Sequence, residues 1–432
     1  MSKRDGITWL YRELPELVRS RVLDETTAER LREHYGPAPR QRRKSLGVVI
    51  CAALGALLVG LGIILLLAHN WTELSRPQRT LLSFAPLLLG QAVAGWSWLK
   101  RRSSIAWCEG AATFLLLAVG ASIALVGQTY HISGDLPRFV LVWMLLGVPL
   151  VYLLRAALPA LLYWPGVTWW CVLGAFDRLP VMFFWLLAAL PLPFWWQLVR
   201  SGQRRLVAAW MAWMLSLCLA VGLGFSCYSF FEDFWAPLYL SLFAVYFLLF
   251  GQLSVPSAVG RPFRLLGSWG TVALLLLLTL KDVWRSFAFN PLLGPGREAW
   301  PQYLLLAVLL LAAIGLLTRA LASRQWMDTL FGLAPPLVIL QLLAGPQRLA
   351  TGISLILANL YLLFLGGLVL RDGLQSGGLP RINAGLGILS ALIAVRFFDS
   401  QLPFTVRGVL FILIGLAFLG VNLLVKRREV SV

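Results

Sequence analysis

The sequence predicts an all-α, polytopic helical membrane protein, and three observations lead to this fold class. Of the 432 residues, 59% are hydrophobic and only 13% are charged, with a mean hydropathy of +0.78, whereas soluble domains carry about 25% charged residues. Apolar stretches of about 20 residues, long enough for a helix to cross a bilayer, recur along the chain. The basic residues stand in short clusters between these stretches, which is typical of cytoplasmic loops and argues against a nucleic-acid partner.

Residues 1–44 are the longest polar segment, and we expect a cytoplasmic amphipathic helical hairpin that ends in a basic juxtamembrane stretch. Leu10 and Leu14 lie at helical spacing, Asp24 is suited to cap a second helix, and Gly36-Pro37 is suited to end it. A helix-turn-helix reader of DNA is the alternative. This segment contains no apolar core of a signal peptide, so the first span is expected to direct insertion itself.

Residues 45–425 are expected to form a bundle of about fourteen transmembrane helices, followed by a basic cytoplasmic tail, 426–432. The candidate spans are 46–68, 80–99, 107–127, 138–154, 157–176, 181–199, 206–227, 235–252, 264–281, 301–319, 328–344, 349–370, 382–397 and 405–425. The fifth is the weakest, because Pro159 and Pro165 interrupt it, and we expect it to be kinked and packed inside the bundle.

The distribution of positive charge predicts that both termini are cytoplasmic. With fourteen spans and the amino terminus inside, 27 of the 37 Lys and Arg residues fall in inside segments or at the inside ends of spans. Losing one span in mid-chain would put Lys100-Arg101-Arg102 and Lys426-Arg427-Arg428 on opposite faces of the membrane. The positive-inside rule therefore favours an even number of spans.

Polar residues concentrate at the outside ends of spans one, three, thirteen and fourteen. They are His69, Asn70, Trp71, Gln128, Tyr130, His131, Asp135, Arg396, Asp399 and Arg407. Ionisable groups at a membrane are costly and mark candidate functional sites, so we expect these span ends to meet at one working surface. The alternative is that the residues cap helix ends and anchor loops at the headgroups.

One acidic residue, Glu109, lies about one turn inside the third span and is the candidate intramembrane acid. A carboxylate in the first turn of a helix is stabilised by the helix dipole, so capping of its own helix is one interpretation. Proton coupling is the other, and it requires that Glu109 face a cavity together with polar residues such as Gln341 and Asn359.

No metal site or cofactor is predicted. A site made of His69, His131 and Asp135 is the alternative, but its spacing is not diagnostic, because the chain has no paired-His motif. The sequence also has no phosphate-binding loop, dinucleotide fingerprint or nucleophile elbow.

The outside motifs resemble those of a bacterial family of predicted membrane proteins known as domain of unknown function 2157. The resemblance rests on His69-Asn70-Trp71, on Gly127 to His131 with Gly134-Asp135, on Arg396 to Asp399, and on Arg407-Gly408. It covers the N-terminal hairpin, spans one to four and the last two spans. It implies a multi-pass protein of the bacterial inner membrane and a membrane-anchored partner with a GDYxxLxY motif, but no catalytic residue.

These observations favour a non-enzymatic component of the membrane, either of the transport type or an assembly scaffold. Its surroundings would be the lipid bilayer, and its working surface the outside ends of spans one, three, thirteen and fourteen. The alternative is a membrane enzyme acting on a lipid-linked envelope substrate, for which outside arginines and a His or carboxylate base would suffice.

Overall fold

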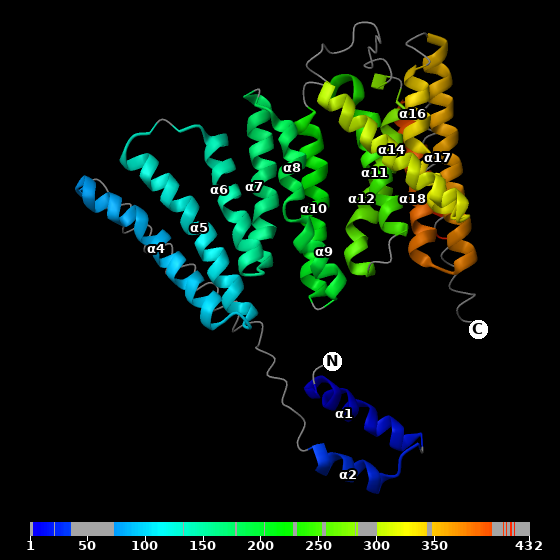
Figure 1. Cartoon of the computed structure of the whole chain (residues 1–432). Helices are drawn as coiled ribbons and strands as arrows, with labels where there is room; N and C mark the ends of the chain where they lie inside the picture. The colour runs from blue at the N-terminus through cyan, green and yellow to red at the C-terminus, as the bar shows by residue number, and fades with distance from the viewer. Residues whose placement is uncertain are drawn as a thin grey trace. The chain divides into compact units, whose positions relative to one another are not determined.

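The computed structural model describes residues 3–20, 22–35, 73–132, 134–177, 179–202, 204–227, 231–252, 256–280, 282–283, 300–343 and 348–399, with 409, 412, 415, 416 and 419. The regular elements in these ranges are all helical (Figure 1). They are α1 (Lys3–Arg19), α2 (Glu25–Tyr35), α4 (Arg76–Lys100), α5 (Ile105–Thr129), α6 (Leu136–Leu153), α7 (Ala157–Phe176), η1 (Val181–Phe183), α8 (Phe184–Ala189), α9 (Leu192–Ser201), α10 (Arg205–Ser226), α11 (Phe231–Gln252), α12 (Ser257–Leu278), α14 (Trp300–Ala322), α15 (Trp326–Gly332), α16 (Ala334–Leu343), α17 (Arg348–Ser376) and α18 (Leu379–Asp399). The chain divides into two compact units, Met1–Arg79 and Thr80–Val432.

In the first unit, α1 and α2 pack against each other as a helical hairpin. Leu14 of α1 is fully buried and Ala28 of α2 is almost so, and the Tyr11 hydroxyl donates to the carbonyl of Arg32 at 3.2 Å. The second helix begins directly after Asp24. This contact between two short helices buries little apolar surface, which fits a small appendage better than a domain that is stable alone.

Nine helices among the described residues are long and apolar enough to cross a membrane. They include α4, α5, α6, α10, α12, α14, α17 and α18, and the segment Val181–Ser201 that contains η1, α8 and α9. The segments Trp235–Phe250 and Trp326–Ile339 are apolar but shorter. The expected spans 46–68 and 405–425 lie outside the continuously described residues.

The expected fifth span corresponds to the helix α7, which has 20 residues and is not one of these nine. Pro165 lies within the helix and Pro159 in its first turn. Tyr163 and Trp164 are almost completely buried, and they donate to the carbonyls of Leu187 at 3.1 Å and Ala188 at 3.0 Å. As expected, the proline-containing helix is packed inside the bundle.

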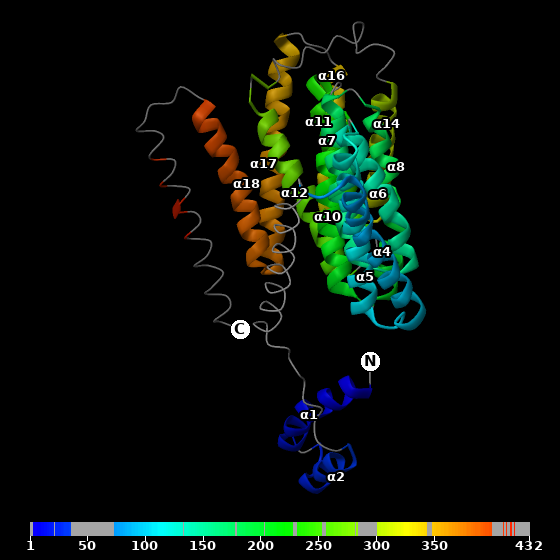
Figure 2. The ribbon, with the colours of Figure 1, turned by 90° about the vertical axis from the view of Figure 1, so that its left-hand side faces the viewer.

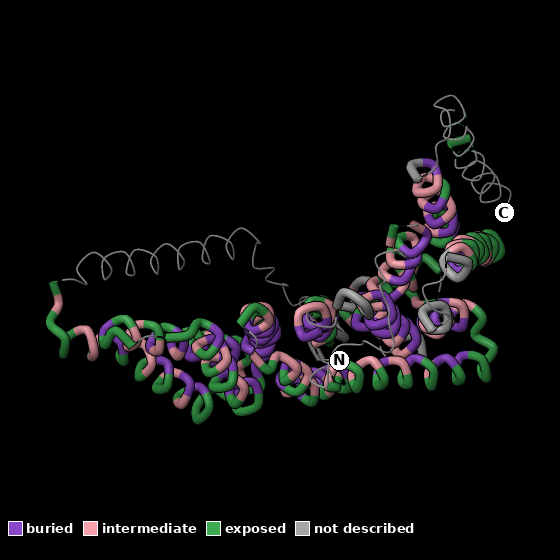
Figure 3. Tube along the Cα trace, turned by 90° about the horizontal axis from the view of Figure 1, so that it is seen from above, coloured by how far each residue is buried: buried purple, intermediate pink, exposed green. Residues whose placement is uncertain are grey.

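Within the second unit, most helices contact a neighbour in sequence and one further helix. The helix α7 lies between α6 and α10, while α12 contacts α10, α11 and α17. The view from above shows buried residues where the helices face one another and exposed residues along the outer sides (Figure 3). The largest core joins α6 to α12, and its aromatic centre includes Phe250 and Phe263, stacked with ring centroids 4.0 Å apart. This packing fixes the positions of the ends of α7 and α10.

The helices α17 and α18 form a closely packed antiparallel pair (Figures 1 and 2). Two glycines allow their backbones to approach. A Cβ on Gly385 would lie 2.5 Å from the amide nitrogen of Leu370, and one on Gly373 would lie 2.6 Å from that of Ile382. Small residues permit this type of helix contact in membranes, where packing replaces the hydrophobic effect as the main driving force.

Candidate functional site

Glu109 is the centre of a buried polar cluster that joins three helical segments. Its Oε1 atom accepts a hydrogen bond from the backbone amide of Ala157 at 2.9 Å, and Oε2 accepts one from the amide of Leu158 at 2.8 Å. The Nη2 atom of Arg204 lies 2.5 Å from Oε1. The side chain of Glu109 is 10% exposed and that of Arg204 is 20% exposed. We call Glu109, Arg204 and the two amides the Glu109 cluster.

The start of α7 explains why a carboxylate is needed at this position. The first amides of any helix have no carbonyl partner within the helix. Ala156, which precedes α7, has no side chain that could cap them. Pro159 has no amide proton, so Ala157 and Leu158 are the two residues among the first three of α7 whose amides need an acceptor from outside the helix. Glu109 from α5 accepts both hydrogen bonds, and its negative charge is favoured at the helix N-terminus.

The positive partner of Glu109 comes from the turn between α9 and α10. Gly202 ends α9 with φ of 64°, a left-handed conformation that glycine adopts at little cost. Trp195 supports the same turn by donating from its indole nitrogen to the carbonyl of Ala208 at 3.0 Å. The turn thus delivers the guanidinium of Arg204 to a carboxylate 95 residues earlier in the chain.

The structure therefore corrects one sequence-based interpretation of Glu109. The carboxylate caps α7 and not its own helix, because Glu109 lies far enough into α5 to reach the neighbouring helix start. It is also bonded to three donors, which engage both of its oxygens, and proton coupling stays a prediction. The sequence analysis did not identify Arg204 as a partner of Glu109. The one feature of the sequence that could have pointed to Arg204 is its position in a short turn between two apolar stretches.

The exit of α5 forms a turn that places several of the predicted site residues at the surface. Tyr130, His131 and Asp135 are exposed, as is Gln128 in the last turn of the helix. The Tyr130 hydroxyl lies 2.9 Å from the hydroxyl of Thr80 in α4. These polar groups belong to a segment of eight residues, so the structure brings them together at one end of α5.

Asp135 and His131 both contribute to the structure of this turn, Asp135 through its side chain and His131 through its backbone conformation. Asp135 immediately precedes α6, and its Oδ2 atom lies 3.3 Å from Nε of Arg138, whose side chain is 81% exposed. His131 has φ of 50°, a left-handed conformation in which a side chain is strained. The amide of Ile132 then donates to the carbonyl of Gly127 at 3.0 Å, which closes the turn.

We expect the two roles of His131, in the backbone and as a side chain, to be separable by substitution. His131→Val should lower the free energy of unfolding by about 1–2 kcal/mol, because a β-branched residue tolerates positive φ poorly. His131→Gly should change it by less than about 1 kcal/mol, because glycine accepts this conformation but loses more entropy on folding. Chemical denaturation of both variants in the same detergent measures the difference. Equal stability of the two would contradict the strained-turn interpretation.

The other predicted residues are not gathered at the exit of α5. Arg396 lies at the end of α18, half-buried, and donates to the carbonyl of Thr279. The helix α18 contacts α17 and α12, whereas α5 contacts α6 and α7, and both side views keep α5 and α18 apart (Figures 1 and 2). The structure thus does not bring spans three and thirteen together. Four further predicted site residues lie outside the described residues, namely His69, Asn70, Trp71 and Arg407, and the side chain of Asp399 is also outside them.

Asn359, another polar residue within a predicted span, serves local packing. The amide nitrogen of Asn359 donates to the carbonyl of Leu355, one turn earlier in α17, at 2.7 Å. The side chain of Gln341 lies outside the described residues. Across residues 3–399, gaps aside, no group of three or more His, Cys, Asp and Glu side chains is arranged to hold a metal ion.

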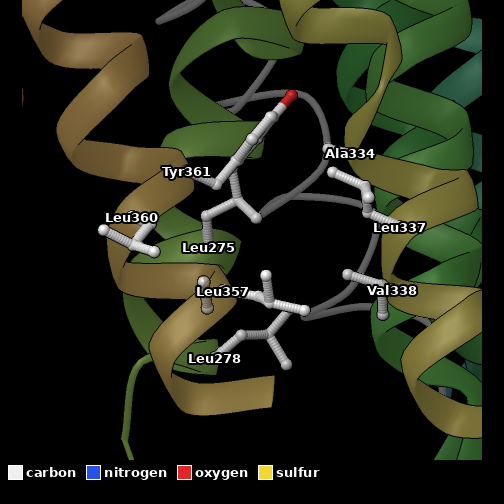
Figure 4. A pocket seen from close by; sticks show the side chains of 9 residues that line it. Leu275, Leu278, Ala334, Leu337, Val338, Leu357, Leu360 and Tyr361 are labelled. Carbon is white, nitrogen blue, oxygen red and sulfur yellow. The ribbon is translucent and has the colours of Figure 1, made fainter. Parts of the chain in front are cut away.

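A cavity of about 250 Å³ lies between α12, α16 and α17, and its walls are apolar (Figure 4). They are built mainly of leucine side chains such as Leu275, Leu278 and Leu337. The one polar side-chain atom drawn at this cavity is the hydroxyl of Tyr361, and that hydroxyl donates to the carbonyl of Leu330. The cavity therefore offers no polar route for an ion.

Comparison with known proteins supports the resemblance for the amino-terminal part of the chain. Residues 15–160 match the family described as predicted membrane protein (DUF2157). The match includes the second helix of the hairpin, the exit of α5 and Glu109, but not the motifs at Arg396 and Arg407. No curated protein and no solved structure matches the chain. Residues 15–160 of this membrane protein are therefore similar to the DUF2157 family of predicted membrane proteins.

Proposed function

We propose that this protein is a non-enzymatic assembly scaffold of a bacterial inner membrane. The observation that carries the proposal is the state of the buried acid: Glu109 is occupied by two backbone amides and Arg204. Such an arrangement holds α5, α7 and α10 in fixed positions. A transporter needs polar groups that exchange partners along a path, whereas the cavity between α12, α16 and α17 is apolar.

The topology that goes with this proposal has fourteen spans and both termini in the cytoplasm. Bonds between helix ends support it, because the fourteen-span order puts both partners of each bond on one side of the membrane. On the inside these are Glu109 with Ala157 and Arg204, and Arg264 with Asp328; on the outside they are Thr80 with Tyr130, Trp185 with Ser226, and Thr279 with Arg396.

Reporter fusions test this topology. A topology reporter fused after Val432 should indicate a cytoplasmic location. A reporter inserted between Asp282 and Trp300 should indicate a periplasmic location. The physical reason is that most basic residues then remain on the cytoplasmic side. If both fusions reported the same side of the membrane, the fourteen-span topology would be excluded.

The proposed working surface is the exit of α5, and the proposed occupant is the membrane-anchored partner with a GDYxxLxY motif. Gln128 and His131 are exposed there, and their side chains make no hydrogen bond to other described residues. An imidazole and an amide next to the membrane surface can bind the tyrosine hydroxyls and the aspartate of such a motif. The Glu109 cluster would keep this surface in a constant orientation.

Site-specific photo-crosslinking tests the partner. A photoreactive residue in place of Gln128 should crosslink the co-expressed partner, and crosslinking should fall at least fivefold when the motif tyrosines are changed to alanine. The same residue in place of Arg102, which is exposed in the turn before the start of α5, is the matched control. His131→Gly should reduce crosslinking while protein abundance stays unchanged. Equal crosslinking from both positions, or none, would reject the exit of α5 as the docking site.

A further inference from the structure

A second pocket, of about 300 Å³, lies between α11, α12, α15, α17 and α18 and differs from the apolar cavity in its chemistry. Its floor is apolar and includes Val272, Phe331 and Ile388, which are buried. Its rim carries two arginines, Arg264 and Arg381. The volume is at the lower end of the range for ligand pockets, about 300–1,000 Å³. We call it the Arg264/Arg381 pocket.

The two rim arginines are only partly engaged by acidic residues. Nη2 of Arg264 lies 3.9 Å from Oδ1 of Asp328, and the side chain of Arg264 is 50% exposed. Nη1 of Arg381 lies 3.0 Å from Oδ2 of Asp372, and the side chain of Arg381 is 63% exposed. A guanidinium has five N–H donors, so each arginine keeps donors for a further acceptor.

The balance of charge around the pocket is positive. Arg261 is exposed one turn before Arg264 in α12, and Arg371 is exposed next to Asp372 in α17. Two of these four arginines line the pocket and the other two lie close to lining residues in sequence, whereas the nearby carboxylates are those of Asp328 and Asp372. An anionic group is therefore favoured at the rim over a neutral or zwitterionic one, and arginine is well suited to phosphate because it can donate two parallel hydrogen bonds.

The apolar floor points to a ligand that also has a hydrocarbon part. Trp269, another lining residue, is 49% exposed, and half-exposed tryptophans are typical of the level of the lipid headgroups. Arg264 stacks over the ring of Phe247 with its Cζ atom 5.2 Å from the centroid, so its guanidinium stands where charged rim and apolar floor meet. Basic pockets between transmembrane helices bind anionic lipid headgroups in other proteins.

We propose that the Arg264/Arg381 pocket binds one anionic glycerophospholipid, with the phosphate at the two arginines and the start of an acyl chain on the apolar floor. The bound lipid would link α12 to the α17–α18 pair and would stabilise their contact. This site is separate from the exit of α5 and does not depend on the proposed scaffold function.

The test uses the full chain in a non-ionic detergent, with lipid binding followed by native mass spectrometry and by thermal unfolding. Added phosphatidylglycerol should bind and raise the unfolding temperature, whereas phosphatidylcholine should bind at least tenfold more weakly. Arg264→Gln and Arg381→Gln should each weaken phosphatidylglycerol binding roughly fivefold, since a basic residue at the surface contributes about 1 kcal/mol towards an anionic lipid. Arg319→Gln, at an exposed position of α14, is the control and should bind normally.

Two further measurements distinguish the alternatives. Inorganic phosphate at millimolar concentration should neither stabilise the protein nor compete with the lipid, because it cannot use the apolar floor. Ser268→Phe narrows the pocket without altering either ion pair and should also reduce lipid binding, which covers the case that the arginine variants fold poorly. Stabilisation by phosphate alone would show a simple anion site, and equal binding of both lipids by all variants would overturn the proposal.

Discussion

Glu109→Ala should be among the most destabilising single substitutions in the described part of the chain. Removing one partner of a buried ion pair typically costs about 3–5 kcal/mol, because the remaining charge stays behind without compensation. Here the two amides at the start of α7 also lose their acceptor, and each buried unsatisfied donor costs about 1–3 kcal/mol. Arg204 is 20% exposed and can move towards water, so we expect a total near 4 kcal/mol in denaturant unfolding.

A double-substitution cycle separates the two parts of this effect. Glu109→Leu combined with Arg204→Met removes both charges, so the double variant should be more stable than Glu109→Leu alone. It should remain less stable than the natural protein, because the amides of Ala157 and Leu158 still lack an acceptor. Arg138→Ala, which breaks only the exposed ion pair with Asp135, is the control and should cost less than about 1 kcal/mol. Equal stability of Glu109→Ala and Arg138→Ala would refute the structural role of the cluster.

Most of the helical architecture was predictable because apolar stretches of span length are local features of the sequence. The expected spans 107–127 and 138–154 correspond to α5 (Ile105–Thr129) and α6 (Leu136–Leu153). The interruptions were not predicted. The span expected at 181–199 consists of η1, α8 and α9, with a break at Leu190 and Pro191. Proline removes a backbone donor there, but hydropathy alone does not register such a break.

The candidate site was predictable in its residues but not in their partners. The polar exit of α5 was visible because its residues are adjacent in sequence. The partners of Glu109 come from turns 48 and 95 residues away, and such pairing depends on how α5, α7 and α10 pack. The prediction that spans three and thirteen lie side by side was wrong for the same reason. A shared polar character does not specify which helices are neighbours, and α18 packs on α17 and α12 instead.

Gly385→Ala should separate α17 from α18 and strongly lower the stability of the bundle. The added Cβ would lie 2.5 Å from the amide nitrogen of Leu370 and 2.7 Å from its Cα, so the backbone itself would have to move. Overpacking a core costs about 1–3 kcal/mol when side chains can adjust, and here a rigid backbone is the obstacle, so we expect about 3 kcal/mol or more. Denaturant unfolding and protein abundance in the membrane both measure the loss.

Gly387→Ala is the matched control in the same helix, two residues further along. A Cβ at Gly387 would meet nothing within 4 Å, and alanine has a higher helix propensity than glycine by about 1 kcal/mol. This variant should therefore be as stable as the natural protein or slightly more stable. Because the two substitutions are chemically identical, a difference of about 3 kcal/mol or more between them reports the contact with α17 alone. If Gly385→Ala were as stable as Gly387→Ala, the close packing of α17 on α18 would be incorrect.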